Sequence, residues 1–107
     1  MHSAPGSDGP QIGEVLAALD DPVRLEMVRR LANAAEPVRC KFLYDGISKS
    51  TASHHFAVLR EAGVTESISG EGAVYQRLRA RELERDLPGV VRSIVAAANE
   101  SSKSTET

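Results

Sequence analysis

The segment SKSTASHHFAVLREAG, residues 48–63, carries the marks of one helix whose two ends are both defined. Ser48 can act as the N-cap, because its hydroxyl can accept a hydrogen bond from a free amide of the first turn. Gly63 stands where a helix favours a left-handed residue after its last turn. Three apolar residues at i, i+4 and i+7 predict one buried stripe, namely Ala52, Phe56 and Leu59.

The opposite face of this helix is rich in hydrogen-bond donors over its first two turns. The donors are Lys49, Ser50, Thr51, Ser53 and His54. Such a face suits the DNA major groove, where amides and hydroxyls meet phosphates and longer donors reach base edges. The alternative is a surface helix that is merely rich in serine and threonine. These residues are mediocre helix formers, and their clustering therefore favours a function.

The residues before this helix predict two further helices and a turn. Apolar residues at helical spacing predict a helix over 12–19. Asp21 and Pro22 match an N-cap and a first helical residue, so a second helix is expected over 22–33. A short strand over 38–40, a short helix over 41–44 and a glycine turn follow. A short helix, a turn and the 48–63 helix make a helix-turn-helix arrangement.

The residues after Gly63 change to the alternation typical of strands. We expect strands over 64–69 and 73–79 with a three-residue loop, residues 70–72, between them. A hairpin directly after a recognition helix is a wing, and wings usually contact the DNA backbone. Arg77 and Arg79 are the expected phosphate contacts from this hairpin. A helical turn over 82–86 and a helix from Pro88 to about residue 98 are expected to close the fold.

The last helix carries an apolar stripe with little charge. We expect it to pair, together with the first helix, with the same helices of a second chain in a two-fold contact. The residues expected at this interface are Ile12, Val15, Leu16, Leu19, Val91, Ile94, Val95 and Ala98. The alternative is that the whole stripe belongs to the chain's own core.

Length and composition fit one small domain over residues 11–98, with disordered tails over 1–10 and 99–107. No run approaches the roughly 20 apolar residues that a membrane helix needs. The first residues lack the basic and apolar regions of a signal peptide, so a cytoplasmic protein is expected. The net charge is −2, but residues 22–60 hold seven basic and three acidic residues, a net charge of +4. The basic surplus therefore coincides with the expected recognition helix.

Three segments resemble the ArsR/SmtB family of bacterial winged-helix repressors. They are residues 16–25 with an Asp-Pro-x-Arg element, residues 48–64 at the recognition helix, and residues 72–78 at the second wing strand. The resemblance spans residues 12–98. It implies a mainly α fold with a small β-hairpin wing, a winged helix-turn-helix that dimerises through its first and last helices. It also implies a homodimer that represses transcription from a near-palindromic operator. By resemblance, Arg60 reaches the DNA backbone and His55 lies within the domain or against a phosphate.

The chain departs from the family at the site where many members bind metal through a cysteine pair. It has one cysteine, Cys40, whereas a thiolate site needs several converging ligands. We therefore expect no metal and no cofactor. Cys40 is either a small buried apolar residue or a redox switch, because Arg39 and Lys41 beside it favour the reactive thiolate.

These features favour a DNA-binding regulator over two other classes. A winged-helix module that binds protein instead of DNA is the alternative, supported by the net acidity and by the acidic residues of the wing. An enzyme is not expected, because Ser53 and His54 are neighbours on one helix and their side chains diverge by about 100°. The expected partners are double-stranded DNA and a second copy of the chain, and no membrane is expected. The sequence does not identify a signal, which could be a small molecule or an oxidant.

Overall fold

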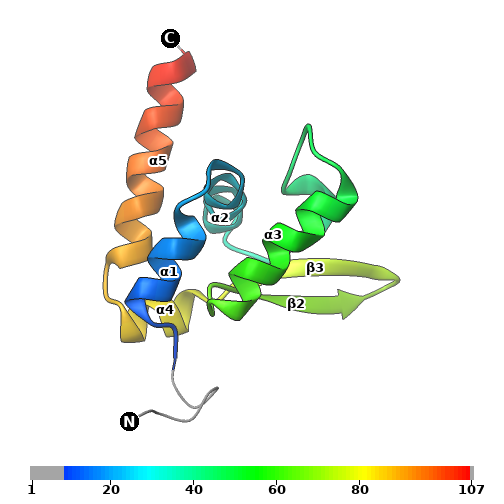
Figure 1. The fold of residues 1–107 in the computed structure, drawn as a ribbon, viewed down its shortest axis with the longest axis horizontal. Helices are drawn as coiled ribbons and strands as arrows, with labels where there is room; N and C mark the ends of the chain where they lie inside the picture. The colour runs from blue at the N-terminus through cyan, green and yellow to red at the C-terminus, as the bar shows by residue number, and fades with distance from the viewer. Residues whose placement is uncertain (1–8, 107) are drawn as a thin grey trace.

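The computed structural model describes residues 9–106, and the side chains of residues 9–102. The helices and strands follow in the order α1 (Ile12–Leu19), α2 (Pro22–Ala34), β1 (Val38–Arg39), the 3-10 turn η1 (Cys40–Phe42), α3 (Lys49–Glu61), β2 (Thr65–Gly70), β3 (Ala73–Leu78), α4 (Ala80–Asp86) and α5 (Val90–Glu106). This is the expected mainly α fold with a small wing (Figure 1). The predicted N-terminal tail lies almost entirely outside the described residues.

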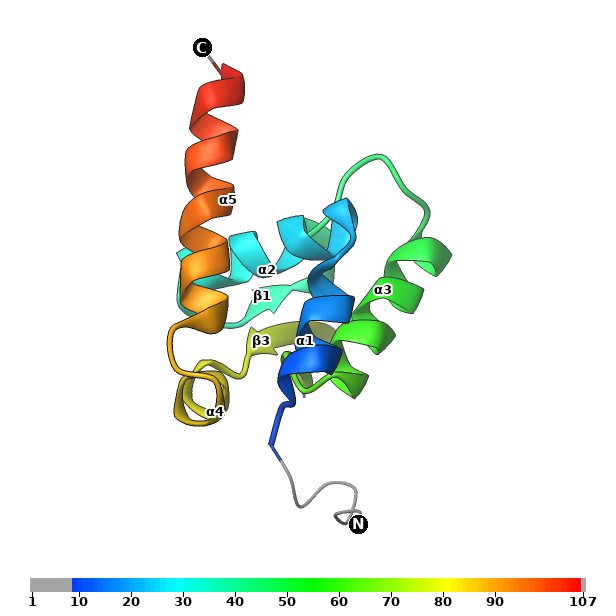
Figure 2. The ribbon, with the colours of Figure 1, turned by 60° about the vertical axis from the view of Figure 1, so that its left-hand side comes forward.

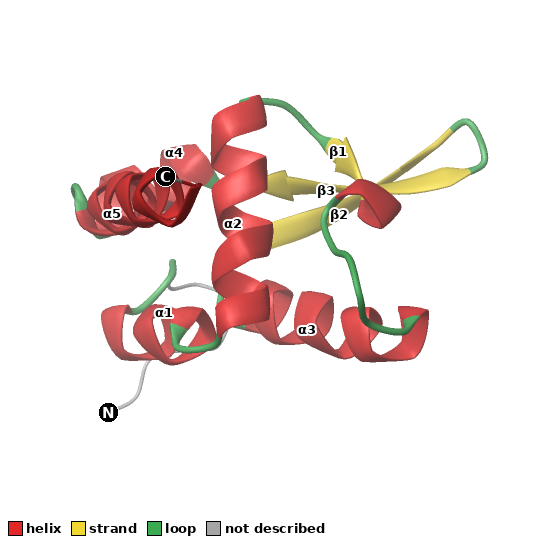
Figure 3. Cartoon of the chain, turned by 90° about the horizontal axis from the view of Figure 1, so that it is seen from above, coloured by secondary structure: helices red, strands yellow, loops and turns green. Residues whose placement is uncertain are grey.

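Helix α2 stands at the centre of the molecule. Seen from above, it separates α4 and α5 on one side from the sheet on the other, with α1 and α3 along one edge (Figure 3). The wing and α5 therefore mark opposite ends of a molecule that measures 47 × 35 × 22 Å. Helix α5 rises well beyond the other helices (Figure 2). Within residues 9–106, no helix combines the length and the apolar character needed to cross a bilayer.

The ends of α2 and α3 confirm the capping signals of the sequence. The Asp21 carboxylate accepts hydrogen bonds from the amides of Val23 and Arg24 at 2.8 and 3.1 Å, directly before Pro22. Ser48 caps α3 by accepting a hydrogen bond from the amide of Thr51 at 3.0 Å. Gly63 follows α3 with φ of +81°, a conformation that side-chain-bearing residues rarely adopt.

The wing is an antiparallel hairpin that β1 extends into a three-stranded sheet in the order β1-β3-β2. Gly70 pairs with Ala73, so the turn contains two residues and not the three that the sequence suggested. The turn residues Glu71 and Gly72 have φ of 51° and 76°. Positive φ at both positions is the type I′ geometry, whose twist matches that of the two strands.

Three predicted boundaries were wrong. The segment expected as a helix over 41–44 is instead the single 3-10 turn η1, followed by a loop to Ser48. Pro88 precedes α5 and does not begin it, because Gly89 with φ of +78° separates the two. Helix α5 also continues to Glu106, beyond the end expected at residue 98.

The core joins every helix to the sheet. Its fully buried side chains include Met27 and Leu31 of α2, Leu59 of α3 and Val64 before β2. The stripe predicted for α3 is confirmed, since its three apolar residues are 0–5% exposed, namely Ala52, Phe56 and Leu59. One face of α3 is thereby fixed against the domain, and the other is left to solvent.

Candidate nucleic-acid interface

The exposed face of α3 presents polar side chains that form no hydrogen bond or ion pair with the residues that the structure describes, although the His54 ring lies 5.5 Å from the His55 ring. Lys49, Ser50, Ser53 and His54 are exposed, and their side chains form no hydrogen bond or ion pair with any residue in 9–106. Thr51 is also exposed, but its hydroxyl accepts a hydrogen bond from Ser48 at 3.0 Å. The first two turns of α3 therefore offer one ammonium group, several hydroxyls and an imidazole to an outside partner.

A groove of about 540 Å³ lies beside α3, between this helix, η1 and the wing. Four basic side chains line it, namely Arg39, Lys41, Lys49 and Arg60. In the part of the chain that the structure describes, none of the four is in an ion pair; Arg60 donates only a long hydrogen bond of 3.5 Å to Ser67. We call them the groove cations. Lys41 lies 5.3 Å from the centre of the Phe42 ring, but none of the four has a carboxylate partner in the described chain. Cations without a carboxylate partner, next to hydroxyls, provide what a DNA backbone requires.

Arg39 and Lys41 are the members of this group that the sequence did not single out as DNA contacts. They precede α3 by several residues and reach the groove because β1 pairs with β3, with Arg39 opposite Tyr75. Their charges were visible in the sequence only as neighbours of Cys40. The pairing of β1 with the wing could not be derived from local periodicity, and this pairing brings their side chains to α3.

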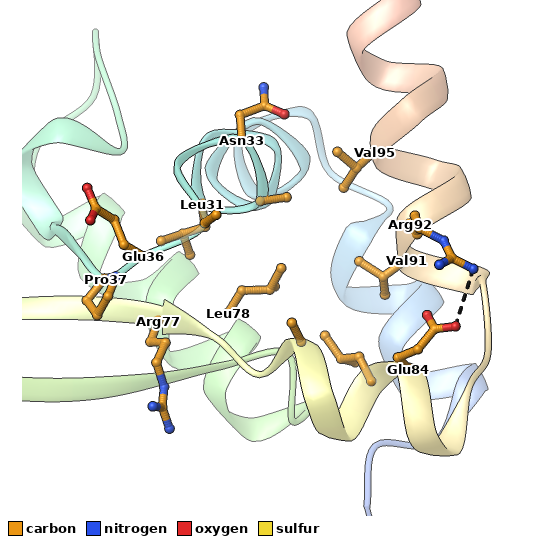
Figure 4. A pocket seen from close by; sticks show the side chains of 14 residues that line it. Leu31, Asn33, Glu36, Pro37, Arg77, Leu78, Glu84, Val91, Arg92 and Val95 are labelled. Atoms are coloured by element: carbon orange, nitrogen blue, oxygen red, sulfur yellow. Dashed lines mark hydrogen bonds and ion pairs between the residues drawn. The ribbon is translucent and has the colours of Figure 1, made fainter.

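The structure does not place Arg77 in the groove. Arg77 lies opposite Glu66 in the register of the wing strands, and the two side chains form an ion pair. Its side chain instead lines a second cavity, of about 630 Å³, between α2, β3, α4 and α5 (Figure 4). The apolar walls of this cavity include Leu31 and Val91, and the ion pair between Glu84 and Arg92, 3.3 Å long, lies at its edge.

His55 ties α3 to the rest of the domain. Its Nδ1 lies 3.0 Å from Nη1 of Arg24, whose Nε donates to the carbonyl oxygen of Ala18 at 2.6 Å. A guanidinium carries only donors, so Nδ1 of His55 must be the acceptor of this bond. Burial opposes ionisation of Asp21 beside them, but the bonds from the amides of Arg24 and Val23 outweigh it and lower the pKa of the carboxyl. Arg24 therefore connects α1, α2 and α3.

A second network fixes the loop that leads into α3. Arg30 donates to Glu26 at 2.8 Å and to Asp45 at 2.6 Å, and Arg29 donates to both carboxylate oxygens of Glu26. The hydrogen bonds from Arg29 and then from Arg30 outweigh the effect of burial and lower the pKa of Glu26 to about 2. The network holds the loop at Asp45 against α2 and so positions the first turn of α3.

Cys40 lies half-buried at the floor of the same groove. Its Sγ is 3.6 Å from Nε2 of Gln76, a side chain of β3 that is 1% exposed. Both residues line the groove with Ser53 and Ser67. Within residues 9–106, no group of three or more His, Cys, Asp or Glu side chains is arranged to hold a metal ion.

The residues predicted for the dimer interface fall into two groups. Val15, Leu19, Val91 and Val95 are at most 7% exposed and belong to the chain's own core, so they are not free for a partner. Four others are exposed or half-buried, namely Ile12, Leu16, Ile94 and Ala98. Ile12 and Leu16 of α1 are 51% and 46% exposed and lie four residues apart, on one face of the helix.

Comparisons with known proteins agree with this geometry. A helix-turn-helix domain family matches residues 19–68. The chain is 32% identical over 90 residues to the uncharacterized HTH-type transcriptional regulator YceK of Bacillus subtilis (strain 168), covering 82% of this chain and 90% of that one. The crystal structure of the transcriptional repressor BigR from Xylella fastidiosa matches with a TM-score of 0.63 and 26% identity, covering 80% and 84% of the two chains.

An ArsR-like transcriptional regulator from Rhodococcus sp. RHA1 has the same fold, with a TM-score of 0.60 at 21% identity over 89% of this chain and 86% of that one. The wing, the capped and donor-rich helix α3 and these relatives all point to one class of protein. The chain belongs to the HTH-type transcriptional regulators, DNA-binding proteins that are not enzymes, and it has the winged helix-turn-helix fold of an ArsR-like regulator.

Proposed function

We propose that this regulator is a repressor that binds a near-palindromic operator as a homodimer. The observation that carries the proposal is the coincidence of two features on one side of the domain. The free donors of α3 and the unpaired groove cations lie next to each other. In this arrangement Ser50, Ser53 and His54 read base edges or phosphates, while the groove cations hold the DNA backbone.

The homodimer is supported by the apolar side chains that α1 and α5 leave uncovered. Ile12 and Leu16 are about half exposed, and Ile94 and Ala98 are partly exposed on α5. A two-fold contact through these helices removes this apolar surface from water in both chains. Two recognition helices then enter successive major grooves about 34–36 Å apart. The DNA-binding and dimerisation domain is proposed to begin at residue 11 and to include α5, which continues to Glu106. The cytoplasm, where the operator is, is its proposed location.

Hydroxyl-radical footprinting on the DNA upstream of the protein's own gene tests this geometry. The proposal predicts two protected half-sites of related and inverted sequence, with centres about one helical turn apart. Run-off transcription from the same fragment is expected to decrease as protein is added, in keeping with the likeness to the repressor BigR. A single protected half-site would contradict the dimer, and increased transcription would contradict repression.

We also propose redox control through Cys40, and its place in the groove supports this proposal. Cys40 lies in the groove with the cations proposed to hold DNA, and a chemical change there reaches the interface directly. The first test is the loss of DNA binding on treatment with diamide. The proposal predicts that diamide releases the parent protein from DNA, whereas Cys40→Ser remains bound. Equal release by both proteins would exclude Cys40 as the sensor.

A further inference from the structure

The side chain of Gln76 has an unusual environment for a buried amide. It is 1% exposed, and its Nε2 donates to Oγ of Ser67 at 2.8 Å and toward Sγ of Cys40 at 3.6 Å. Its Oε1 is buried and has no donor among the residues that the structure describes. Leaving such an acceptor unsatisfied costs about 1–3 kcal/mol. The side chain that contacts the thiol through Nε2 therefore also carries a buried acceptor, Oε1, without the donor that it requires.

The thiol beside this acceptor is suited to oxidation. Cys40 is half-buried but lines the groove, so a small molecule that enters the groove reaches its sulfur. The four groove cations line the same groove as this sulfur. The chain contains no second cysteine. Oxidation within one molecule therefore stops at an oxygen adduct of the sulfur instead of a disulfide.

We propose that Cys40 is a peroxide-sensing residue whose sulfenic acid is held by Gln76. This deepens the redox control proposed above and rests on it. The sulfur attacks one oxygen of hydrogen peroxide, an S–O bond forms and the O–O bond breaks. Sulfur loses two electrons and the peroxide gains them. The thiol proton leaves with the departing hydroxide as water, and the product is Cys–S–OH.

The product supplies the donor that the reduced protein lacks. The sulfenic O–H is a hydrogen-bond donor, and Oε1 of Gln76 is the free acceptor on the side chain that already contacts Sγ. The bond joins η1 to β3 through groups at the floor of the groove. The added oxygen also occupies space in the groove that Lys49 and Arg60, which are proposed to bind DNA, also line. Oxidation is therefore expected to weaken DNA binding and to be reversed by a thiol reductant.

The experiment uses the full chain, reduced and then treated with one equivalent of hydrogen peroxide. Dimedone, which reacts with sulfenic acids, is added, and the adduct is measured by intact mass spectrometry. The parent protein is expected to give one dimedone adduct at Cys40, and Cys40→Ser none. In Gln76→Leu the trapped adduct is expected to fall about fivefold, the factor that one neutral hydrogen bond is worth. Gln11→Leu, at an exposed glutamine, is the control and is expected to match the parent.

DNA binding is measured on the same samples by fluorescence anisotropy. Oxidation of the parent is expected to weaken binding by about 5- to 150-fold, the usual range of coupling between two sites. Three results would overturn the proposal: no adduct on the parent, a disulfide-linked dimer in its place, or an unchanged affinity after oxidation. If Gln76→Leu is folded by circular dichroism and gives as much dimedone adduct as the parent, Gln76 does not hold the sulfenic acid. A reduced protein that binds no DNA would instead refute the proposed function, and the mass measurement would still decide the chemistry of Cys40.

Discussion

Replacing Arg39 with alanine tests the part of the interface that only the three-dimensional structure shows. Arg39 is exposed, lines the groove beside α3 and, within residues 9–106, has no ion-pair partner. Its loss should therefore leave the fold intact and remove one phosphate contact from each chain. Stability is expected to change by less than about 0.5 kcal/mol, as for other surface substitutions.

The magnitude follows from the release of counterions. Each phosphate contact adds about −0.9 to the slope of log K against log salt concentration. A dimer that uses all four groove cations of both chains has a slope of about −7, and Arg39→Ala reduces its magnitude by about 1.8. At a salt concentration of about 0.15 M the same relation predicts binding about thirtyfold weaker. The loss should be nearly the same on operator and unrelated DNA, because phosphates carry no sequence information.

The assay is fluorescence anisotropy with labelled duplex at several salt concentrations. Arg81→Ala is the matched control, because Arg81 is an exposed arginine on α4 that does not line the groove. It changes the net charge of the protein by the same amount. The reasoning predicts a reduced slope for Arg39→Ala and the parent slope for Arg81→Ala. If both variants reduced the salt slope equally, the reduction would come from the change in net charge and not from the groove.

Three further predictions concern specificity, assembly and stability. Ser53→Ala and His54→Ala should abolish the preference for the operator while the melting temperature stays nearly constant, and a large loss of stability would make these side chains structural. Leu16→Glu should convert a dimer to a folded monomer in light scattering coupled to size exclusion, since Leu16 is 46% exposed on the proposed interface. A dimer that persists would move the interface elsewhere. The Glu26 carboxylate, with its pKa lowered to about 2 from 4.5, should stabilise the fold above pH 4.5 and lose this contribution as pH falls toward 2. Urea unfolding at pH 6 and pH 3 should therefore show a smaller pH dependence in Glu26→Gln than in the parent.

The sequence predicted well where a local rule determines the structure. Asp21, Pro22, Ser48 and Gly63 mark helix ends through their own backbone and capping chemistry, and each lies where expected. The buried stripe of α3 is equally local, because it depends only on helical spacing. The order of helices and wing followed from these elements.

Local rules could not show the surroundings of residues whose neighbours are distant in sequence. Arg77 remains a predicted DNA contact, and the strand register adds that it forms an ion pair with Glu66. The apolar stripes of α1 and α5 could not show by themselves which side chains the chain's own core would use. Val15 and Val95 are buried in it, whereas Leu16 is left exposed. Arg39 reaches α3 only through the pairing of β1 with β3.

The measurement that tests the central claim most directly is anisotropy on the DNA upstream of the protein's own gene. It would use the reduced full chain, three salt concentrations and an excess of unrelated duplex as competitor. The account predicts tight binding that weakens steeply with salt and survives the competitor. Binding that the competitor abolishes would contradict operator recognition by α3. The absence of binding to any duplex would favour a winged-helix module that binds protein, and the free donors and cations beside α3 would then face a different partner.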